Sequence, residues 1–95
     1  MIMVTHLVFF KFASLEIAEE AKEQLLAMAG KIPGMQSIEA GVDFTRSERS
    51  FDLGLVTRHD DREALAVYQG HPVHQEVVKF IRARAQGSAA VDFVS

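Results

Sequence analysis

One apolar segment, residues 2–12, restricts the folds open to this chain of 95 residues. It is rich in β-branched and aromatic residues, which is typical of a β-strand. A strand with one face in water alternates apolar and polar side chains. Here both faces are mostly apolar, so we expect both to be covered. The two alternating sets are Ile2, Val4, His6, Val8, Phe10 and Phe12, and Met3, Thr5, Leu7, Phe9 and Lys11.

Helix and strand signals follow in a regular order. Helices are indicated by capping residues, apolar stripes at helical spacing and a proline at a first helical position. The predicted elements are a helix from the N-cap Ser14 through Met28 to Gly30, a strand at 38–44, a polar hairpin loop at 45–50, a strand at 51–57, a helix opened by a capping-box pattern at 60–63 and broken at Gly70 and His71, its continuation from Pro72 to Gly87, and a strand at 89–95.

The order β-α-β-β-α-β predicts an α+β, ferredoxin-like domain over residues 1–95, with an antiparallel sheet and the helices on one face. No segment remains to cover the other face, and an exposed apolar sheet face usually marks an interface. A domain of this size also gains from burial against a second subunit. We therefore expect a homodimer in which two sheets face each other, although the pattern does not say which face of the first strand is shared.

Composition excludes several classes of function. The net charge is −3 and no basic block is present, so a nucleic-acid partner is not expected. No apolar run has the length of a membrane span, and the N-terminal segment lacks the features of a signal peptide. The chain has no cysteine, which removes disulfide and thiolate chemistry. We expect a cytoplasmic protein.

Four short stretches together resemble the stress-responsive α/β-barrel (Dabb) domain family: "THLVFFKF", "IPG", "EAGVDF" and above all "YQGHPVH". The resemblance covers residues 4–94 and implies a dimeric α+β barrel. His59 stands where the family often has a large apolar residue, in the wall of its pocket. The family's functions are mixed: some members are linked to stress responses, a plant member is a polyketide cyclase, and related barrels include cofactor-free monooxygenases of aromatic compounds.

A metal site is one interpretation of "YQGHPVH". His71 and His74 are three residues apart, so they could share a helix face and chelate a metal. However, His71 falls at the N-cap, where its side chain need not follow the helical direction, and no carboxylate offers an obvious third ligand. We therefore predict no metal site and no cofactor, with His71 capping the helix or facing solvent.

A reactive pair is the second interpretation. His74 falls near the start of a helix, where the macrodipole disfavours an imidazolium, and a neutral imidazole can act as a general base. Tyr68 offers a hydroxyl that can donate to a developing oxyanion. The resemblance to the polyketide cyclase assigns the catalytic roles to Tyr68 and His74. The alternative is structural: Tyr68 packs the helix break with its hydroxyl bonded to backbone, and His74 is a buried, hydrogen-bonded histidine.

Two function hypotheses follow. One is a cofactor-free, polyketide-cyclase-like or proton-transfer enzyme acting on a small carbonyl or aromatic compound, with oxygenation of an aromatic as a weaker variant. The other is a non-catalytic dimeric module that binds a small apolar or aromatic ligand or serves in a stress response. In either case His6, His59 and His71 are candidate ligand contacts, and His6 is equally compatible with a structural role. A cavity joining Tyr68 and His74 would favour the enzyme.

Overall fold

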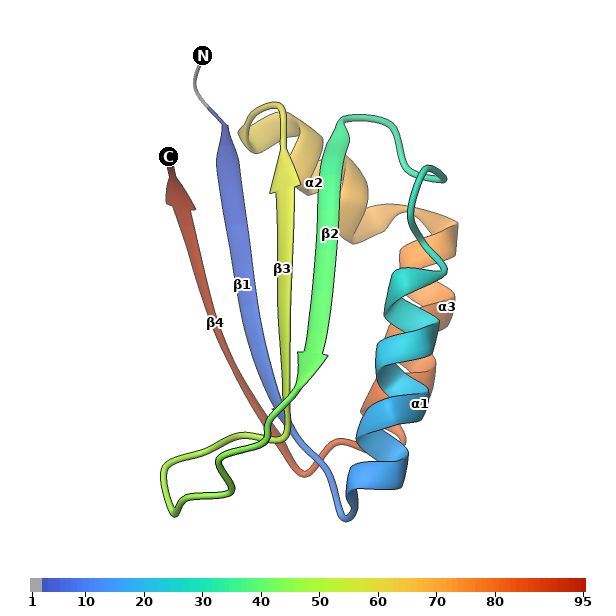
Figure 1. Cartoon of the computed structure of the whole chain (residues 1–95). Helices are drawn as coiled ribbons and strands as arrows, with labels where there is room; N and C mark the ends of the chain where they lie inside the picture. Colours follow the sequence, from blue (N-terminus) through green and yellow to red (C-terminus); the bar gives the residue numbers. More distant parts are fainter. Residues whose placement is uncertain (1–2) are drawn as a thin grey trace.

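The computed structural model describes residues 3–95, which form a four-stranded antiparallel sheet with three helices on one face (Figure 1). The predicted element order and the ferredoxin-like fold are confirmed. Residue 2 of the first predicted strand lies outside the described residues. The elements are β1 (Val4–Lys11), α1 (Leu15–Leu26), β2 (Met35–Val42), β3 (Leu53–His59), α2 (Arg62–Gly70), α3 (Pro72–Arg82) and β4 (Gly87–Val94).

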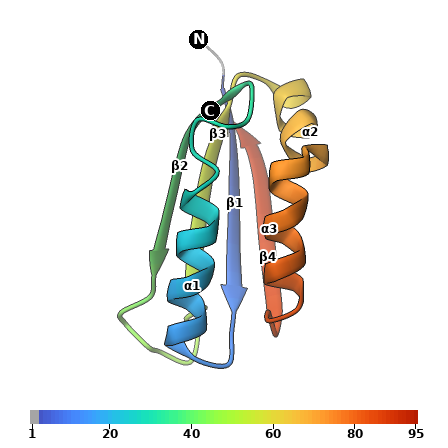
Figure 2. The same cartoon turned by 90° about the vertical axis from the view of Figure 1, so that its right-hand side faces the viewer.

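The sheet has the order β2-β3-β1-β4, so β1 is a central strand. Val8 pairs with Leu55 of β3 and with Ala90 of β4, and this register puts the even-numbered side chains of β1 toward the helices. Figure 2 shows α1 in front of the sheet and α3 in front of β4. The core between the layers contains Val4, Val8, Phe10, Phe12, Ala18, Ala21, Leu25, Met28, Ile32, Leu53, Leu55, Leu65, Tyr68, Val77 and Ile81.

The helix starts follow local capping chemistry. The Ser14 hydroxyl accepts a hydrogen bond from the backbone N–H of Ile17, as predicted for an N-cap. The capping box predicted at 60–63 is one residue out of place. Asp61 is the cap of α2 and accepts from the N–H of Ala64, whereas the Asp60 carboxylate accepts from the side chain of Gln36 on β2.

Other boundaries also differ from the prediction, and β2 occupies Met35–Val42 instead of residues 38–44. Helix α1 stops at Leu26 because the chain tightens into turns, with the N–H of Met28 bonded to the carbonyl of Leu25. The β2–β3 connection spans residues 43–52 rather than 45–50, and β3 consequently runs on to include His59. Helix α3 ends at Arg82, ahead of Gly87, which instead begins β4.

The sheet face opposite the helices is uncovered by any described part of the chain (Figure 1). It carries the odd-numbered side chains of β1, and Leu7 on this face pairs with Val56 and Val91. Phe9, Val91 and Phe93 are all large, apolar and exposed. The sequence pattern does not say which face of the first strand is shared with a partner. In the structure, the apolar face that stays exposed is the one that carries Leu7 and Phe9.

Asp52 joins the wide β2–β3 loop to the end of β1. One oxygen of its buried carboxylate accepts the backbone N–H of Phe12 at 2.7 Å, and the other accepts the guanidinium of Arg46 at 2.6 Å. The hydrogen bond from Phe12 is the main reason that the pKa of Asp52 lies below its usual value. The backbone of Asp52 also donates to the carbonyl of Phe10. This residue therefore fixes the loop against the central strand.

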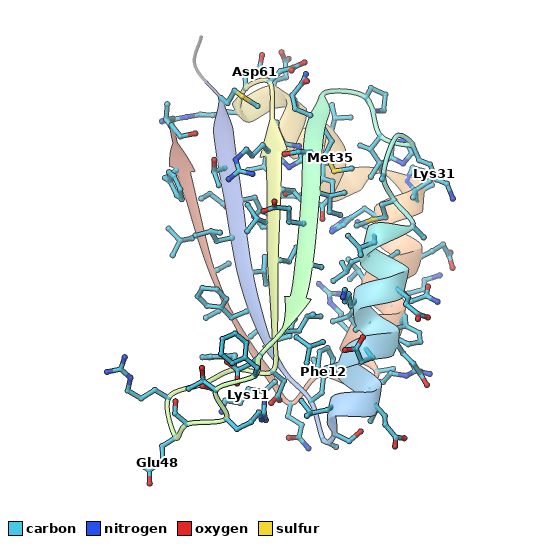
Figure 3. All side chains as sticks on the ribbon, viewed as in Figure 1. Lys11, Phe12, Lys31, Met35, Glu48 and Asp61 are labelled. Atoms are coloured by element: carbon cyan, nitrogen blue, oxygen red, sulfur yellow. The ribbon has the colours of Figure 1, made fainter. Side chains whose placement is uncertain are left out.

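We expect Asp52→Ala to lower the free energy of unfolding by about 1–3 kcal/mol, because it leaves the buried N–H of Phe12 without an acceptor. Urea denaturation of the variant beside the parent measures the loss. Glu48→Ala is the control, since Glu48 projects into solvent from the same loop (Figure 3) and should change stability by less than about 0.5 kcal/mol. Equal midpoints for the two variants would contradict this role for Asp52.

Candidate functional site

Tyr68 lies at the centre of a group of three histidines that come from three different elements. Its ring centroid is 4.2 Å from that of His74 on α3, 4.8 Å from that of His59 on β3 and 5.9 Å from that of His6 on β1. Tyr68 itself is in the last turn of α2 and is fully buried. The fold thus brings together four of the five residues singled out in the sequence.

A cavity of about 280 Å³ joins His6, Tyr68 and His74. Its lining residues come mainly from α3 on one side and from the strands β1 and β4 on the other. Its wall is mainly aliphatic, which suits a small ligand with few polar groups. The remaining lining residues are Val8, Phe10, Leu25, Leu55, Val77, Val78, Ile81, Arg82, Ala85, Ser88 and Ala90.

The hydroxyl of Tyr68 has no hydrogen-bond partner among residues 3–95. Burial raises the pKa of Tyr68 to about 12, so the group stays protonated near neutral pH. A buried hydroxyl normally has a partner, because leaving it unpaired costs free energy. The structural alternative, in which backbone satisfies this hydroxyl, is therefore not what the structure has, and Tyr68 is one of the residues that line the cavity.

The tautomer of His74 follows from its partner. Its Nδ1 lies 3.1 Å from the backbone carbonyl of Gln69, and a carbonyl can only accept, so Nδ1 carries the proton. Nε2 is left with the lone pair on a ring that lines the cavity. Burial lowers the pKa of His74, although the bond to Gln69 opposes this effect. The residue is consequently a neutral base at neutral pH.

His6 is held by a partner that the sequence pattern did not single out. Its Nδ1 hydrogen-bonds the carboxylate of Asp92, which stands directly opposite on β4. Because the carboxylate accepts the proton of Nδ1, Nε2 is the ring nitrogen of His6 that is left for another partner. Asp92 is the one charged residue of the last predicted strand. A single charged residue in an otherwise uncharged strand could have marked Asp92 as a candidate site residue. Its pairing with His6, however, depends on the strand register.

His59 and His71 do not line the cavity. His59 is fully buried behind Tyr68, with Nε2 2.8 Å from the hydroxyl of Thr57, so it supports the tyrosine ring instead of meeting a ligand. His71 is half-buried at the start of α3, where its Nδ1 accepts the N–H of Val73. The predicted capping role of His71 is confirmed, and neither residue is placed for the ligand contact that was expected.

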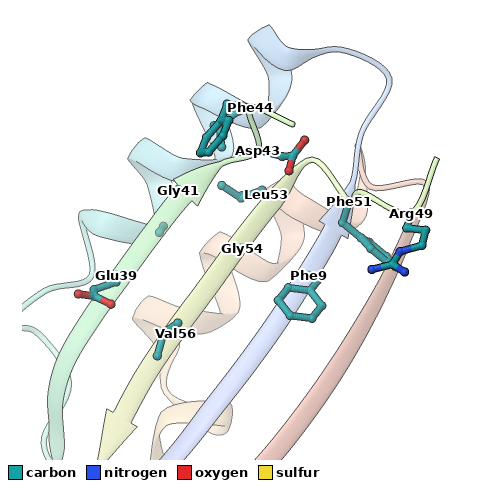
Figure 4. Close-up of a pocket in the computed structure, with 12 residues that line it drawn as sticks. Phe9, Glu39, Gly41, Asp43, Phe44, Arg49, Phe51, Leu53, Gly54 and Val56 are labelled. Carbon is teal, nitrogen blue, oxygen red and sulfur yellow. The ribbon is translucent and has the colours of Figure 1, made fainter. Parts of the chain in front are cut away.

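A larger hollow of about 660 Å³ lies on the open sheet face (Figure 4). Gly41 and Gly54 stand opposite each other on β2 and β3, and their missing side chains leave the gap beside Phe9. Although this hollow is larger, it is broadly open, and the buried histidines and Tyr68 are not part of it. We therefore place the candidate site in the smaller cavity and assign the hollow to the apolar face.

Within residues 3–95, no three histidine or carboxylate side chains converge as metal ligands. The same residues contain no helix with the length and apolar character needed to cross a bilayer.

Comparisons with known proteins agree with this geometry. A family model described as "Stress responsive A/B Barrel Domain" matches residues 4–95. No curated protein sequence matches the chain. Among solved structures, a dimeric protein of unknown function with a ferredoxin-like fold from Bacteroides fragilis is 26% identical, with a TM-score of 0.85 over 96% of this chain and 94% of its own.

Two enzymes share the fold at lower identity. Hydroxynitrile lyase from Passiflora edulis is 13% identical, with a TM-score of 0.83 over 98% of this chain and 93% of its own. SnoaB, a cofactor-independent oxygenase from Streptomyces nogalater, is 16% identical, with a TM-score of 0.75 over 96% of this chain and 90% of its own. These likenesses concern the fold alone.

The imidazoles of His59, which is buried, and His74, which is half-buried, make a pH-dependent contribution to stability. Desolvation lowers the pKa of both His59 and His74 below the usual 6.5. Below that pH the unfolded chain binds more protons than the folded one, so stability present above pH 6.5 is lost as the pH falls through the two folded pKa values. We expect urea midpoints to drop over this window, and NMR of the imidazole protons should show His59 and His74 titrating later than a free imidazole on acidification. A midpoint at the ordinary value for His74 would mean that its ring is solvated.

Proposed function

Because the chain belongs to the stress-responsive A/B barrel domain family, we propose that it is a small dimeric enzyme that moves a proton α to a carbonyl without a cofactor. The observation that carries the proposal is the unpartnered, buried hydroxyl of Tyr68 beside the neutral imidazole of His74 in one cavity. A perturbed acid and base that share a partly enclosed, mainly apolar space are typical of a reactive site.

The proposed step uses each group as its protonation state allows. Nε2 of His74 takes a proton from the carbon next to the carbonyl, and the C–H electron pair becomes the enolate. The Tyr68 hydroxyl donates a hydrogen bond to the enolate oxygen, where negative charge develops. The enolate carbon then regains a proton from His74, or it attacks a second carbonyl of the same molecule, whose oxygen takes up the electron pair of its π bond and the proton that His74 holds. The second outcome is a ring closure of the polyketide-cyclase kind.

His6 and His59 have supporting roles in this scheme. The contact with Asp92 fixes the ring of His6, and its free Nε2 can accept a hydrogen bond from a hydroxyl of the substrate. His59 packs behind Tyr68 and holds the phenol ring in place. Enzymes such as the hydroxynitrile lyase and the cofactor-independent oxygenase named above show that the fold accommodates catalysis, but the chemistry has to be argued from these residues.

A non-catalytic ligand-binding module is the second candidate, and the aliphatic wall of the cavity favours it. Such a module would use the same Tyr68 hydroxyl to orient a bound carbonyl or phenol. A measurement of turnover distinguishes the two candidate functions, because only the enzyme requires His74 as a base.

We also propose that the protein forms a homodimer through the open sheet face. Phe9, Val91 and Phe93 on this face are exposed in the single chain, and burying them supplies the association energy. The similar Bacteroides fragilis protein is described as dimeric. Side chains of a second copy would fill the hollow beside Gly41 and Gly54.

The proton-transfer proposal predicts that the protein speeds the exchange of deuterium from D₂O into the carbons next to the carbonyl of nonan-2-one, followed by NMR. His74→Ala should reduce exchange to the buffer rate, and Tyr68→Phe should lower it by roughly 10²-fold through loss of the oxyanion donor. His71→Ala is the control, because His71 lies outside the cavity, and it should retain most of the activity. Binding of the ketone without accelerated exchange in the parent would favour the ligand-binding module instead.

The assembly proposal predicts a dimer mass in sedimentation equilibrium at micromolar concentration. Val91→Asp should shift the mass toward the monomer, because it buries an unpaired charge between the sheets. Val67→Asp is the matched control, since Val67 is similarly exposed but lies on α2, away from the open face. A stable monomer of the parent protein, or equal dissociation of both variants, would argue against a sheet-to-sheet interface.

A further inference from the structure

The cavity has a second polar end that the proposed reaction does not use. Arg82 of α3 and Ser88 of β4 are exposed side chains that line the cavity, and along α3 and β1 they lie away from His6, Tyr68 and His74. Ser88 faces the helix side of the sheet, because it pairs with Phe10 on β1. The space between the two ends is walled by aliphatic residues such as Val78 and Ile81.

The distance between these two ends follows from the residue spacing along α3 and along β1. Arg82 follows His74 by two helical turns on α3, which corresponds to about 12 Å along the axis. Phe10, which marks the position of Ser88, follows His6 by four residues on β1, which corresponds to about 13 Å. Strand β1 and helix α3 run in the same direction (Figure 2), so the two estimates describe one elongated cavity.

The charge of Arg82 is not neutralised by a carboxylate among residues 3–95, and no other side-chain contact holds its guanidinium, whereas two nearby cations do have partners. Lys79 pairs with Glu76 at 3.6 Å. Arg84 stacks on the ring of Phe80, 3.8 Å from its centroid, and donates to the Phe80 carbonyl. Burial is the main cause of the low pKa of His74, and the positive charge of Arg82 also lowers it, which indicates that the guanidinium acts on the same space.

We propose that the substrate is an amphipathic oxo-acid, with its carbonyl at Tyr68 and His74, an aliphatic or aromatic body along the cavity, and its carboxylate at Arg82 and Ser88. This inference rests on the proposed proton-transfer function and adds the substrate class. The orientation follows from charge. A carboxylate beside the neutral His74 and the buried Tyr68 would be desolvated without a cation, whereas the guanidinium of Arg82 offers charge-assisted hydrogen bonds.

Arg82 also has a purely structural interpretation, because a cation in the last turn of a helix favours the macrodipole. Arg84 provides the control for that effect. It is two residues further along and carries the same charge, but it is held by Phe80 and does not line the cavity. Removing either charge has a similar influence on the helix, and only removal at Arg82 changes the cavity.

The test compares two probes that share one methyl ketone, 8-oxononanoate and neutral nonan-2-one, by calorimetric binding and by deuterium exchange. The parent protein should bind the oxo-acid about tenfold more tightly than the ketone, the equivalent of about 1.4 kcal/mol from one charge-assisted pair. Arg82→Gln should remove this preference, because it should weaken calorimetric binding of the oxo-acid about tenfold more than that of the ketone. Arg84→Gln should alter neither probe by more than about twofold.

Each contrary outcome has a distinct meaning. Equal binding of both probes by the parent, or equal losses in Arg82→Gln and Arg84→Gln, would overturn the assignment of the carboxylate to Arg82. Tighter binding of the corresponding phosphonate than of the carboxylate would overturn the choice of anion. If the oxo-acid binds through Arg82 but no exchange occurs, the proton-transfer function fails while the ligand class stands.

Discussion

The break between α2 and α3 determines where the reactive groups of this protein stand. In one continuous helix, Tyr68 and His74 would be separated by six residues, which places them about 120° apart around the axis and about 9 Å apart along it. Their rings are instead 4.2 Å apart. The interruption consists of His71, in an extended conformation, and Pro72, which needs no N–H at the first helical position. His71 closes α2 and caps α3 without meeting a ligand, and the ring of Pro72 fixes the first turn of α3.

The site is locally unfavourable for stability, and the surrounding structure offsets that cost. The Tyr68 hydroxyl and Nδ1 of His59 are both buried without partners among the described residues, and each such group typically costs about 1–3 kcal/mol. Polar groups left unsatisfied in this way are common at functional sites, where a ligand supplies the missing partner. The apolar core against β1 and the hydrogen bonds of Asp52 hold the same strand that carries His6.

The sequence predicted those parts of the site that depend on local chemistry. Proline and the capping histidine mark the helix break, and the resemblance of "YQGHPVH" to its family identified Tyr68 and His74. The sequence could not predict Asp92 as the partner of His6, because a shift of one residue in the β1–β4 register would turn Asp92 to the other face of the sheet. Arg82 was missed for a similar reason, since a cation in the last turn of a helix is common whether or not a cavity adjoins it. The choice of Asp60 over Asp61 as the cap failed by one residue, where several acidic residues offer equivalent side chains.

The two apolar faces of β1 connect the proposed chemistry to the proposed assembly. Phe9 and Phe10 are neighbours in sequence, yet Phe9 points to the open face and Phe10 lines the cavity. A partner sheet packed against Phe9 would hold β1 from one side while the helices hold it from the other. Strand β4, an edge strand, carries Asp92 and Ser88 toward the cavity and Val91 and Phe93 toward the open face. Dimerisation would therefore restrain the strand that positions His6 and that supplies the hydroxyl at the Arg82 end. On this basis, the surface that a small domain needs for stability also orders both polar ends of its cavity.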